Sequence, residues 1–337
     1  MRNATIVFPA KGEVVLEDRP VPAVAEGMLL VRTLKTLIST GTESICFLSK
    51  FTPDTHWANW VKYPFQPGYS QVGIVEDIGA GVTGFEVGEL VATGTQHQAW
   101  ANVWPPSAIK VPEGVTPTDA TWHSLGRIAQ VGVRKADHEL GDSVVIIGLG
   151  LLGQLVTQYA RLMGARQVIA LDTSDFRLEL AKEHGATHCL LMPVQDAKDA
   201  ILELTGGRGV DVAYDITGAW QVLPYALPLV RKHGKVLILG DTGHPEKQVL
   251  TGDVVTRGVS IIGAHASLPG LEVTDKEYWS YGNIESLFLE YIRRGDMVVE
   301  DLVTHIFSPA DCAEAYGALE EQRETMMGVV FDWEADL

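Results

Sequence analysis

The stretch Ser143–Gly153, SVVIIGLGLLG, decides the fold that this sequence predicts. Residues 144–147 are four consecutive apolar residues, a pattern that indicates a strand buried on both faces. The strand runs into a G-x-G-x-x-G spacing and then into the helical pattern QLVTQYARLMGA. In such a turn the first glycine permits the tight reversal, the second lets the backbone approach a pyrophosphate, and the third lets the helix pack closely on the strand. The residues assigned to this predicted phosphate site are Gly148, Gly150, Leu151, Leu152 and Gly153.

A second predicted strand, QVIALD at 167–172, ends in a carboxylate 24 residues after Gly148. Asp172 would accept the hydrogen bonds of an adenosine ribose and repel a 2′-phosphate, which favours NAD over NADP. Arg177 is close enough in sequence to offer a partner for that phosphate, so NADP stays as the alternative. A purely structural interpretation also stays open, in which the glycines serve a turn and Asp172 caps a helix.

Composition narrows the class of protein. The 337 residues are 46% hydrophobic and include 34 glycines, which is typical of an α/β enzyme of two domains. The net charge of −17 argues against nucleic acid or an anionic membrane as a partner. No signal-peptide pattern opens the chain and no apolar run approaches the roughly 18 residues of a membrane span, so we expect a cytoplasmic protein. The three cysteines are far apart, as expected of reduced thiols.

The first 120 residues or so predict short strands punctuated by glycine and proline, at 5–8, 14–17, 28–38, 70–78, 90–93 and 98–103. Their spacing favours a small, irregular β-barrel. Between them, residues 47–65 form a long aromatic-rich loop that carries Trp57 and Trp60. Loops of this length are usually functional, although a loop that packs its own aromatic side chains is the alternative.

The pattern changes at Trp122, where HSLGRIAQVGVRKA has helical periodicity. Strands at 144–147, 167–172, 189–191, 210–215, 235–240 and 259–263 then alternate with helices at 174–184, 196–205 and 219–230. This alternation predicts a doubly wound, six-stranded parallel sheet with helices on both faces. After a linker at 265–270, we expect a helix at 283–294, a strand at 303–306, a helix that begins at Ser308-Pro309 and a strand at 328–331. The predicted domains are 1–124, 125–265 and a return to the first domain at 266–337.

Taken together, these motifs resemble the medium-chain dehydrogenase/reductase superfamily, which contains zinc alcohol dehydrogenases and zinc-free relatives. The resemblance covers essentially the whole chain and includes GLGLLG, Asp172, RLELAKEHGAT, GVDVAYDITG and GKVLILG. The segments ISTGTE, PGYSQVG, LGRIA and GVVFDW are most similar to a branch with bacteriochlorophyllide dehydrogenase-like proteins. The resemblance implies a Rossmann domain, a GroES-like β-barrel domain, and a homodimer formed through the sheet edge near residues 259–265. It also implies hydride transfer between NAD and a small-molecule alcohol or carbonyl in the cleft between the domains; the substrate itself is not identified.

The chain departs from the zinc members of this family at each metal-ligand position. By that resemblance the ligands fall on Thr40, on Tyr69 with Ser70, and on His123, which lies 25 residues before Gly148. Hydroxyl groups bind zinc poorly, and a single imidazole cannot replace three protein ligands. Residues 95–111 contain no cysteine, so the structural zinc lobe is missing as well. We therefore expect a zinc-independent protein.

Without zinc, side chains must handle the proton that accompanies hydride transfer. The resemblance places His123, Tyr69 and Thr42 at the reacting oxygen, with histidine suited to proton transfer at neutral pH. Arg127, four residues after His123, would bind a substrate carboxylate or pair with Glu43. The remaining candidates are Thr40, Trp57 and Trp60 for the substrate, and Thr217, Gly240 and His265 for the cofactor.

Each of these side chains also has an ordinary structural explanation: His123 as a cap or a satisfied interior group, the aromatic residues as core, and His265 as a surface residue. Two other functions remain open. One is reduction of an activated C=C bond, against which Asp172 counts because such relatives usually prefer NADPH. The other is NAD binding without catalysis.

Overall fold

The computed structural model describes residues 2–267, 270 and 278–334. Backbone contacts divide the chain into two compact units, Met1–Arg127 with Pro269–Leu337, and Ile128–Leu268. The sequence predicts boundaries at 124/125 and 265/266, within three residues of this division. Part of the predicted linker at 265–270 lies outside the described residues. Each unit has its own sheet, so the two are described separately.

The unit Ile128–Leu268 contains a six-stranded sheet in which every neighbouring pair is parallel. Its order is β10-β9-β8-β11-β12-β13, so the first strand in the sequence, β8, lies near the centre and the chain winds outward in both directions. This is the strand order of the Rossmann fold, and it confirms the predicted fold class. The strands are β8 (Ser143–Ile147), β9 (Gln167–Asp172), β10 (His188–Leu191), β11 (Val210–Asp215), β12 (Val230–Ile238) and β13 (Ser260–Gly263).

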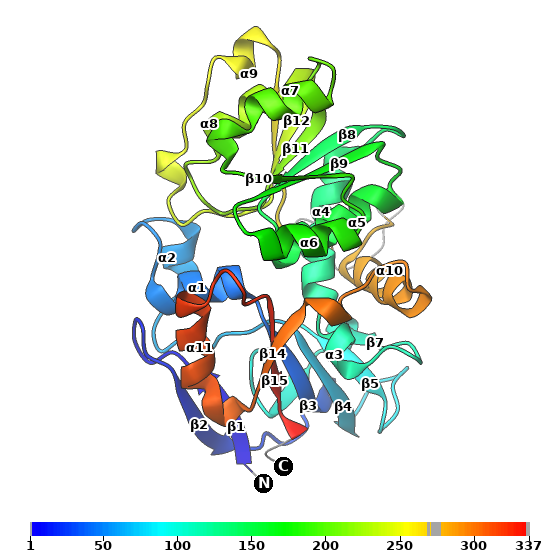
Figure 1. Cartoon of the computed structure of the whole chain (residues 1–337). Helices are drawn as coiled ribbons and strands as arrows, with labels where there is room; N and C mark the ends of the chain where they lie inside the picture. The colour runs from blue at the N-terminus through cyan, green and yellow to red at the C-terminus, as the bar shows by residue number, and fades with distance from the viewer. Residues whose placement is uncertain (1, 268–269, 271–277, 335–337) are drawn as a thin grey trace. The chain divides into compact units, whose positions relative to one another are not determined.

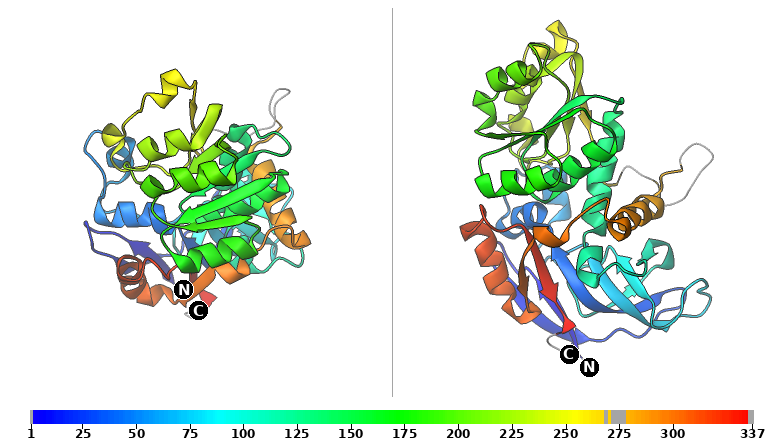
Figure 2. Two further views of the ribbon diagram at one scale, coloured as in Figure 1. Left: turned by 45° about the horizontal axis from the view of Figure 1, so that its top comes forward. Right: turned by 45° about the vertical axis from the view of Figure 1, so that its right-hand side comes forward.

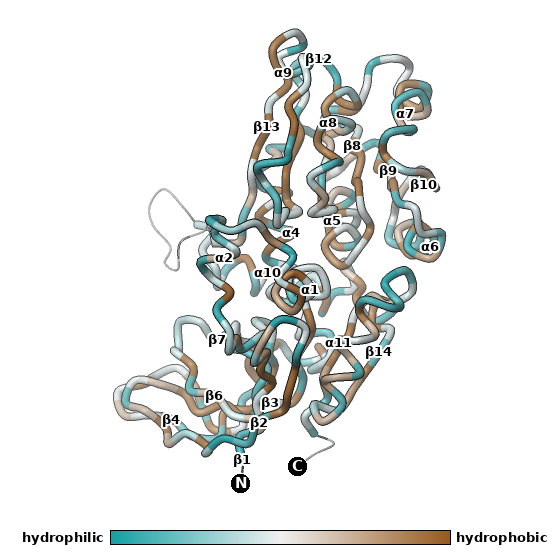
Figure 3. The backbone as a smooth tube through the Cα atoms, turned by 90° about the vertical axis from the view of Figure 1, so that its left-hand side faces the viewer, coloured by the Kyte–Doolittle hydropathy of each residue, from teal (hydrophilic) through white to brown (hydrophobic). Residues whose placement is uncertain are grey.

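Helices cover both faces of this sheet. Figure 1 shows α5 (Leu151–Leu162) and α6 (Asp175–Glu183) on one face, with α7 (Lys198–Leu204) and α8 (Leu223–Ala226) on the other. Every residue of β8 is buried, as expected for a central strand between two helical layers, and Figure 3 shows β8 as a mainly hydrophobic stretch. A short helix, α9 (Asp253–Thr256), precedes β13.

The predicted helix at 219–230 is largely wrong. Only α8 is α-helical there, and a 3₁₀ turn at Leu227–Leu229 leads directly into β12, which begins five residues earlier than predicted. Pro224 and Pro228 explain the difference, because proline lacks the N–H that a continuing helix needs and its ring clashes with the preceding turn.

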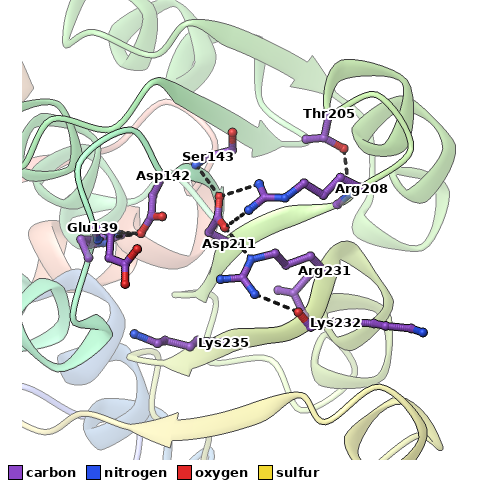
Figure 4. A network of polar contacts seen from close by, with 12 residues as sticks. Glu139, Asp142, Ser143, Thr205, Arg208, Asp211, Arg231, Lys232 and Lys235 are labelled. Carbon is purple, nitrogen blue, oxygen red and sulfur yellow. Dashed lines mark hydrogen bonds and ion pairs between the residues drawn. The ribbon is translucent and has the colours of Figure 1, made fainter.

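A polar network ties the amino ends of β8, β11 and β12 together (Figure 4). Asp211 accepts hydrogen bonds from the backbone N–H of Ser143 at 2.9 Å, from Arg208 Nη2 at 2.6 Å and from Arg231 Nε at 2.6 Å. Burial of Asp211 raises its pKa, but these hydrogen bonds outweigh burial and bring the pKa to about 2. The network lies at the opposite end of the strands from the glycine-rich turn, so we assign it a structural role.

The other unit has a seven-stranded sheet in the order β14-β15-β3-β4-β5-β7, with β6 paired to β3, and a separate hairpin of β1 and β2. Its pairs are antiparallel except β14–β15. β15 pairs with β3 (Val330 opposite Leu37), so the C-terminal segment completes the sheet that the N-terminal segment begins. The strands are β1 (Arg2–Val7), β2 (Val15–Pro20), β3 (Leu29–Ile38), β4 (Gln71–Ile78), β5 (Leu90–Thr93), β6 (Trp100–Val103), β7 (Ala108–Lys110), β14 (Val303–Phe307) and β15 (Gly328–Asp332).

The helices of this unit are α1 (Thr40–Leu48), α2 (His56–Trp60), α3 (Pro117–Ala120), α10 (Tyr281–Arg294) and α11 (Cys312–Glu321). α4 (His123–Ala136) begins here and continues past the division between the units. α1 and α11 contact each other (Figures 1 and 2) and share an aromatic core in which the ring centroids of Phe8 and Tyr316 are 4.9 Å apart.

The sequence did not predict α1 or α2. Gly41, Thr42 and Ser44 have low helix propensity, so α1 depends on tertiary packing and on Glu43, whose carboxylate accepts a hydrogen bond from the Ser39 N–H at 2.8 Å. In the predicted loop, Trp57 is 4% exposed while Trp60 is 50% exposed, and their rings lie 5.9 Å apart. The segment thus packs part of its own aromatic surface, as the alternative interpretation expected.

Within the described residues, no helix is both long and apolar enough to cross a membrane.

Candidate cofactor and proton-transfer residues

The glycine-rich turn after β8 has the geometry that its sequence predicts. Gly148 has a φ of +91°, and a Cβ there would lie 2.9 Å from the Thr217 side chain. A Cβ on Gly153 would lie 2.1 Å from the Gly148 carbonyl oxygen, so the close helix–strand contact requires glycine. At Gly150, in contrast, a Cβ would meet nothing within 4 Å. Gly150 therefore borders open space at the start of α5.

The first turn of α5 is suited to bind an anion. Gly150 is the N-cap and supplies no side-chain hydrogen bond to the first-turn N–H groups, among them those of Leu151 and Leu152. A helix start with uncapped N–H groups and a positive dipole end favours phosphate. The turn therefore fits the pyrophosphate of a dinucleotide.

Asp172 ends β9 beside this turn. Its Oδ2 accepts the Leu149 N–H at 2.6 Å and its Oδ1 accepts the Ser174 N–H at 2.9 Å. Asp172 therefore stabilises two turns, which agrees in part with the alternative interpretation in which it has a structural role. Each oxygen has a second lone pair, so Asp172 retains the capacity to accept ribose hydroxyls. Arg177 lies in the first turn of α6, where its N–H contacts Ser174 Oγ at 3.5 Å.

Two more predicted cofactor residues follow the neighbouring strands. Thr217 comes after β11 and donates from Oγ1 to Asp215 Oδ1 at 2.7 Å, while burial raises the pKa of Asp215 to about 6. Gly240 comes after β12, and a Cβ there would lie 2.4 Å from the Gly218 nitrogen. Because β8, β11 and β12 are adjacent and parallel, Gly148, Thr217 and Gly240 share one edge of the sheet. His265, after β13, is exposed and its Nδ1 contacts Ser267 Oγ at 2.7 Å.

In the other unit, Tyr69 lies among hydroxyl groups. Its OH donates to Ser39 Oγ and lies 3.3 Å from Thr42 Oγ1. Burial raises the pKa of Tyr69 to about 12, so the phenol stays protonated and is a hydrogen-bond donor at neutral pH. Thr40 is the first residue of α1. The structure therefore brings Tyr69 and Thr42 together, as predicted, and adds Ser39, which the sequence analysis missed.

His123 is the first residue of α4 and is fully buried. Its Nδ1 lies 3.2 Å from Glu285 Oε2, an ion-pair distance, and neither of its ring nitrogens has an aligned hydrogen-bond partner among the described residues. Ser124 Oγ donates to the Tyr69 carbonyl at 2.7 Å, which joins the start of α4 to the start of β4. The backbones of the two proposed catalytic residues are thereby close, but the side chains of His123 and Tyr69 contact different groups.

The expected pairing of Arg127 with Glu43 is wrong. Arg127 Nη1 donates to Glu285 Oε1, and its guanidinium lies 4.0 Å from the centre of the Tyr281 ring. Glu43 instead contacts His97 Nε2 at 3.1 Å and accepts the Tyr316 hydroxyl at 2.6 Å. Arg127 is therefore paired with Glu285, which is distant in sequence, and Glu43 has other partners.

Glu285 was missed by the sequence analysis, although a signal was available. In the helix 281–294, Glu285 falls on the face that also carries Phe288 and Leu289 at i+3 and i+4. An acidic residue on an apolar helix face requires a buried partner. The sequence could thus have predicted a buried ion pair, but not its partners.

The donor set does not fit a catalytic zinc ion. Thr40, Tyr69 and His123 supply two hydroxyls and one imidazole, whereas zinc sites are built from thiolate, imidazole and carboxylate. Across the described ranges, no group of three or more histidine, cysteine, aspartate or glutamate side chains is arranged to hold a metal.

Comparisons with known proteins agree with this architecture. The sequence model of the family described as "Zinc-binding dehydrogenase" matches residues 152–275, a range without Thr40, Tyr69 or His123. The chain is 29% identical over 278 residues to D-guloside 3-dehydrogenase of Escherichia coli (strain K12), covering 79% of this chain and 78% of that protein. It is 29% identical over 286 residues to L-threonine 3-dehydrogenase of Bacillus subtilis (strain 168), covering 74% and 79%.

Solved structures show the same fold. A short chain alcohol dehydrogenase of Escherichia coli CFT073, complexed with NADH, matches with a TM-score of 0.83 and 20% identity, covering 98% of this chain and 99% of that one. A putative zinc-binding dehydrogenase of Sinorhizobium meliloti 1021, bound to NADP, matches with a TM-score of 0.79 and 18% identity over the same shares. Together, these matches show that residues 152–275 are similar to the family described as "Zinc-binding dehydrogenase" and that the chain shares the fold of solved dehydrogenase structures.

Proposed function

We propose that the protein is an oxidoreductase that transfers a hydride between NAD and an alcohol or carbonyl substrate without zinc. The observation that carries this proposal is the turn Gly148–Gly153 with its uncapped helix start and Asp172 beside it. The named relatives, a D-guloside 3-dehydrogenase and an L-threonine 3-dehydrogenase, support oxidoreductase chemistry.

NAD, when bound, accepts or supplies the hydride, and the chain's own residues bind it and handle the proton. Gly150 and the first-turn N–H groups of α5 would hold the pyrophosphate, and Asp172 the adenosine ribose. Preference for NAD over NADP rests on the negative charge of Asp172, which would repel a 2′-phosphate.

The proton requires a separate group because an alcohol hydroxyl must lose its proton as the hydride leaves. His123 would accept this proton, and Tyr69, protonated at neutral pH, would donate a hydrogen bond to the substrate oxygen. Thr42 lies 3.3 Å from the Tyr69 hydroxyl and would extend this hydrogen-bonded set. Thr40, Trp57 and Trp60 remain proposed substrate contacts.

The proposal of zinc independence is supported by the donor set at the three positions where zinc relatives carry ligands. We expect elemental analysis of the purified protein to find zinc well below one ion per chain, and activity to survive a chelator. Stoichiometric zinc, or activity lost with the chelator and restored by zinc, would contradict this part of the proposal.

The experiment for the proposed function is a turnover screen that follows NADH absorbance with a panel of polyols, hydroxy acids, aldehydes, ketones and enones. A matched control is the Gly150→Val variant, whose side chain would occupy the open space beside the helix start without disturbing the protein core. We expect turnover of an alcohol–carbonyl pair by the wild type and loss of NADH binding in the variant. Tight NADH binding with no turnover of any compound would favour a non-catalytic NAD-binding protein.

We also propose a homodimer formed through the edge strand β13. β13 ends the order of the six-stranded sheet, and its Ile261 and Ile262 are only partly buried. Light scattering that gives the mass of a monomer at all working concentrations would overturn this proposal.

A further inference from the structure

We propose that Glu285 is a positioning residue for His123, holding the imidazole proton on Nδ1 so that Nε2 is the atom that exchanges a proton with the substrate oxygen. This inference rests on the proposed dehydrogenase function, and it names the residues that prepare His123 for that function.

The arrangement joins two helices of one unit. His123 and Arg127 lie one turn apart on α4, so both side chains project from the same face. Both reach the carboxylate of Glu285 on α10, where Nδ1 of His123 contacts Oε2 at 3.2 Å and Arg127 Nη1 contacts Oε1. Each oxygen of Glu285 therefore serves a different side chain.

The charge on Glu285 determines which ring nitrogen of His123 carries the proton. Glu285 is 3% exposed, and its Oε1 accepts a hydrogen bond from Arg127, whose guanidinium is always charged and favours the ionised carboxylate. The group is therefore an ionised carboxylate, which only accepts hydrogen bonds. A bare Nδ1 lone pair facing it would be repelled, so Nδ1 carries a proton and the neutral ring presents a lone pair at Nε2.

His123 Nε2 is the atom of this cluster that would contact a substrate. It is buried and has no hydrogen-bond partner among the described residues, a state that costs free energy and is unusual in native proteins. A hydroxyl or carbonyl oxygen of a substrate would satisfy it. Hydrogen bonds of catalytic groups are often poorly aligned before the substrate binds, which also accounts for the unaligned Nδ1 contact.

The resulting step is balanced. In the oxidation direction, His123 Nε2 would take the proton of the substrate hydroxyl as its O–H bond breaks and the C=O bond forms, and bound NAD⁺ would supply the acceptor for the hydride released from the carbinol C–H bond. The imidazolium so produced lies against the Glu285 carboxylate, which stabilises its charge. The proton then leaves Nε2 for solvent, and the reverse sequence reduces a carbonyl.

The test reads the position of the proton directly and needs no substrate. The protein is labelled with ¹⁵N-histidine, and the His123 ring signals are identified by their absence from the His123→Gln variant. In the neutral form of the ring, we expect the wild type to show a protonated Nδ1 and an unprotonated Nε2. The Glu285→Gln variant, whose amide both donates and accepts, should move His123 toward the mixed tautomers of an unrestrained ring.

Two controls separate positioning from general disruption. Glu290→Gln removes an exposed carboxylate on the same helix, paired with Arg293, and should leave the His123 signals unchanged. Arg127→Met leaves Glu285 Oε2 in place. This variant should lower the free energy of unfolding, while the His123 ring should keep its proton on Nδ1. A wild-type ring with its proton on Nε2, or a Glu285→Gln spectrum identical to wild type, would overturn the inference whether or not the protein is a dehydrogenase.

Once a substrate is known, Glu285→Gln should lower kcat by about 10²-fold while KM and NADH affinity stay within a few-fold, and Glu285→Asp should restore part of kcat. The wild-type tautomer together with an absence of hydride transfer would reject the proposed function and leave the positioning of His123 intact. A large rise in KM together with a fall in kcat in the Glu285→Gln variant would indicate a structural role only.

Discussion

Two buried histidine–glutamate pairs occur in the same unit, and they differ in how completely their hydrogen bonds are satisfied. In the His97–Glu43 pair, the ring nitrogens contact Thr36 Oγ1 at 2.8 Å and Glu43 Oε2 at 3.1 Å, and Glu43 also accepts Tyr316 and a backbone N–H. In the His123–Glu285 pair, Nε2 of His123 has no partner in the described part of the chain.

This difference distinguishes a structural cluster from a candidate for chemistry. A buried polar network with every atom bonded stabilises the fold and has no atom left for a ligand. A buried nitrogen without a partner destabilises the free protein, and such a cost is expected where a ligand will supply the missing bond. By this criterion we propose a structural role for His97 and a catalytic role for His123.

The largest expected effect is on catalysis by His123. Removing the proton acceptor in His123→Ala should lower kcat by roughly 10²- to 10⁴-fold and leave NADH affinity nearly unchanged. Steady-state kinetics with a substrate from the panel measure kcat, and fluorescence titration measures affinity. A near-wild-type kcat would remove His123 from the mechanism and end the distinction between the two pairs.

Tyr69→Phe belongs to the same test, because it removes only the hydroxyl. It should also lower kcat, and the double variant should lose much less than the product of the two single losses, since groups that act as a unit are not additive. Fully multiplicative losses would show that His123 and Tyr69 act independently.

Asp172 is a carboxylate that already accepts hydrogen bonds from two backbone N–H groups but is proposed to bind the cofactor. If every side chain that already has hydrogen-bond partners had only a structural role, Asp172→Asn would leave the relative affinities for NADH and NADPH unchanged. We expect instead that the preference for NADH over NADPH falls about 10- to 100-fold, because a hydrogen bond to a charged group is worth about 1.5–3 kcal/mol. Parallel titrations with NADH and NADPH decide this, and equal wild-type affinities would contradict the NAD assignment.

Asp215 and Asp211, at opposite ends of β11, should affect the pH dependence of stability in opposite directions. Asp215 has a pKa raised to about 6, so the folded state binds its proton more tightly and stability falls as pH rises from about 4 to about 6. Asp215→Asn should remove this loss and stabilise the protein by about 2 kcal/mol at neutral pH. Asp211 has a pKa near 2, so its contribution is present above about pH 4 and is lost as pH falls toward 2. Asp211→Asn should cost about 1–2 kcal/mol.

Urea unfolding of both variants across this pH range measures these effects. The two curves should move in opposite directions relative to wild type at neutral pH. Destabilisation by Asp215→Asn at neutral pH would show that its ionised form is stabilised by the fold.

The smallest change is expected from a substitution at the His97–Glu43 pair, whose polar atoms have hydrogen-bond partners. Tyr316→Phe removes the hydroxyl that donates to Glu43 and should lower the free energy of unfolding by about 1–2 kcal/mol, with kcat and NADH affinity unchanged. A tenfold or larger loss of kcat at unchanged stability would place the His97–Glu43 cluster in the catalytic machinery.

The sequence predicted the six-stranded sheet well because its signals are local. Buried strands such as 143–147 and 210–215 read as continuous apolar runs, and the glycine spacing defines the first turn. The prediction of a helix at 219–230 is wrong because Pro224 and Pro228 interrupt an otherwise helical pattern. α1 was missed because its residues have low helix propensity and tertiary contacts stabilise it.

The candidate site was predictable only in part. The glycine turn and Asp172 lie within one local unit, so spacing alone identified them, and the family resemblance identified Tyr69, Thr42 and His123. Glu285 could not be matched to His123 because 162 residues separate them and no local pattern links two helices so far apart in sequence. The incorrect pairing of Arg127 with Glu43 has the same cause.

Isotope labelling of the transferred hydride tests the proposed alcohol–carbonyl reaction. The wild-type protein is incubated with a carbonyl substrate and NADH deuterated at its transferable position, and the product is analysed by mass spectrometry and NMR. We predict deuterium on the carbinol carbon of the resulting alcohol, and its loss in His123→Ala. Deuterium on a carbon β to an intact carbonyl would contradict the account in favour of a C=C reductase, and no transfer despite tight NADH binding would contradict it in favour of a binding protein.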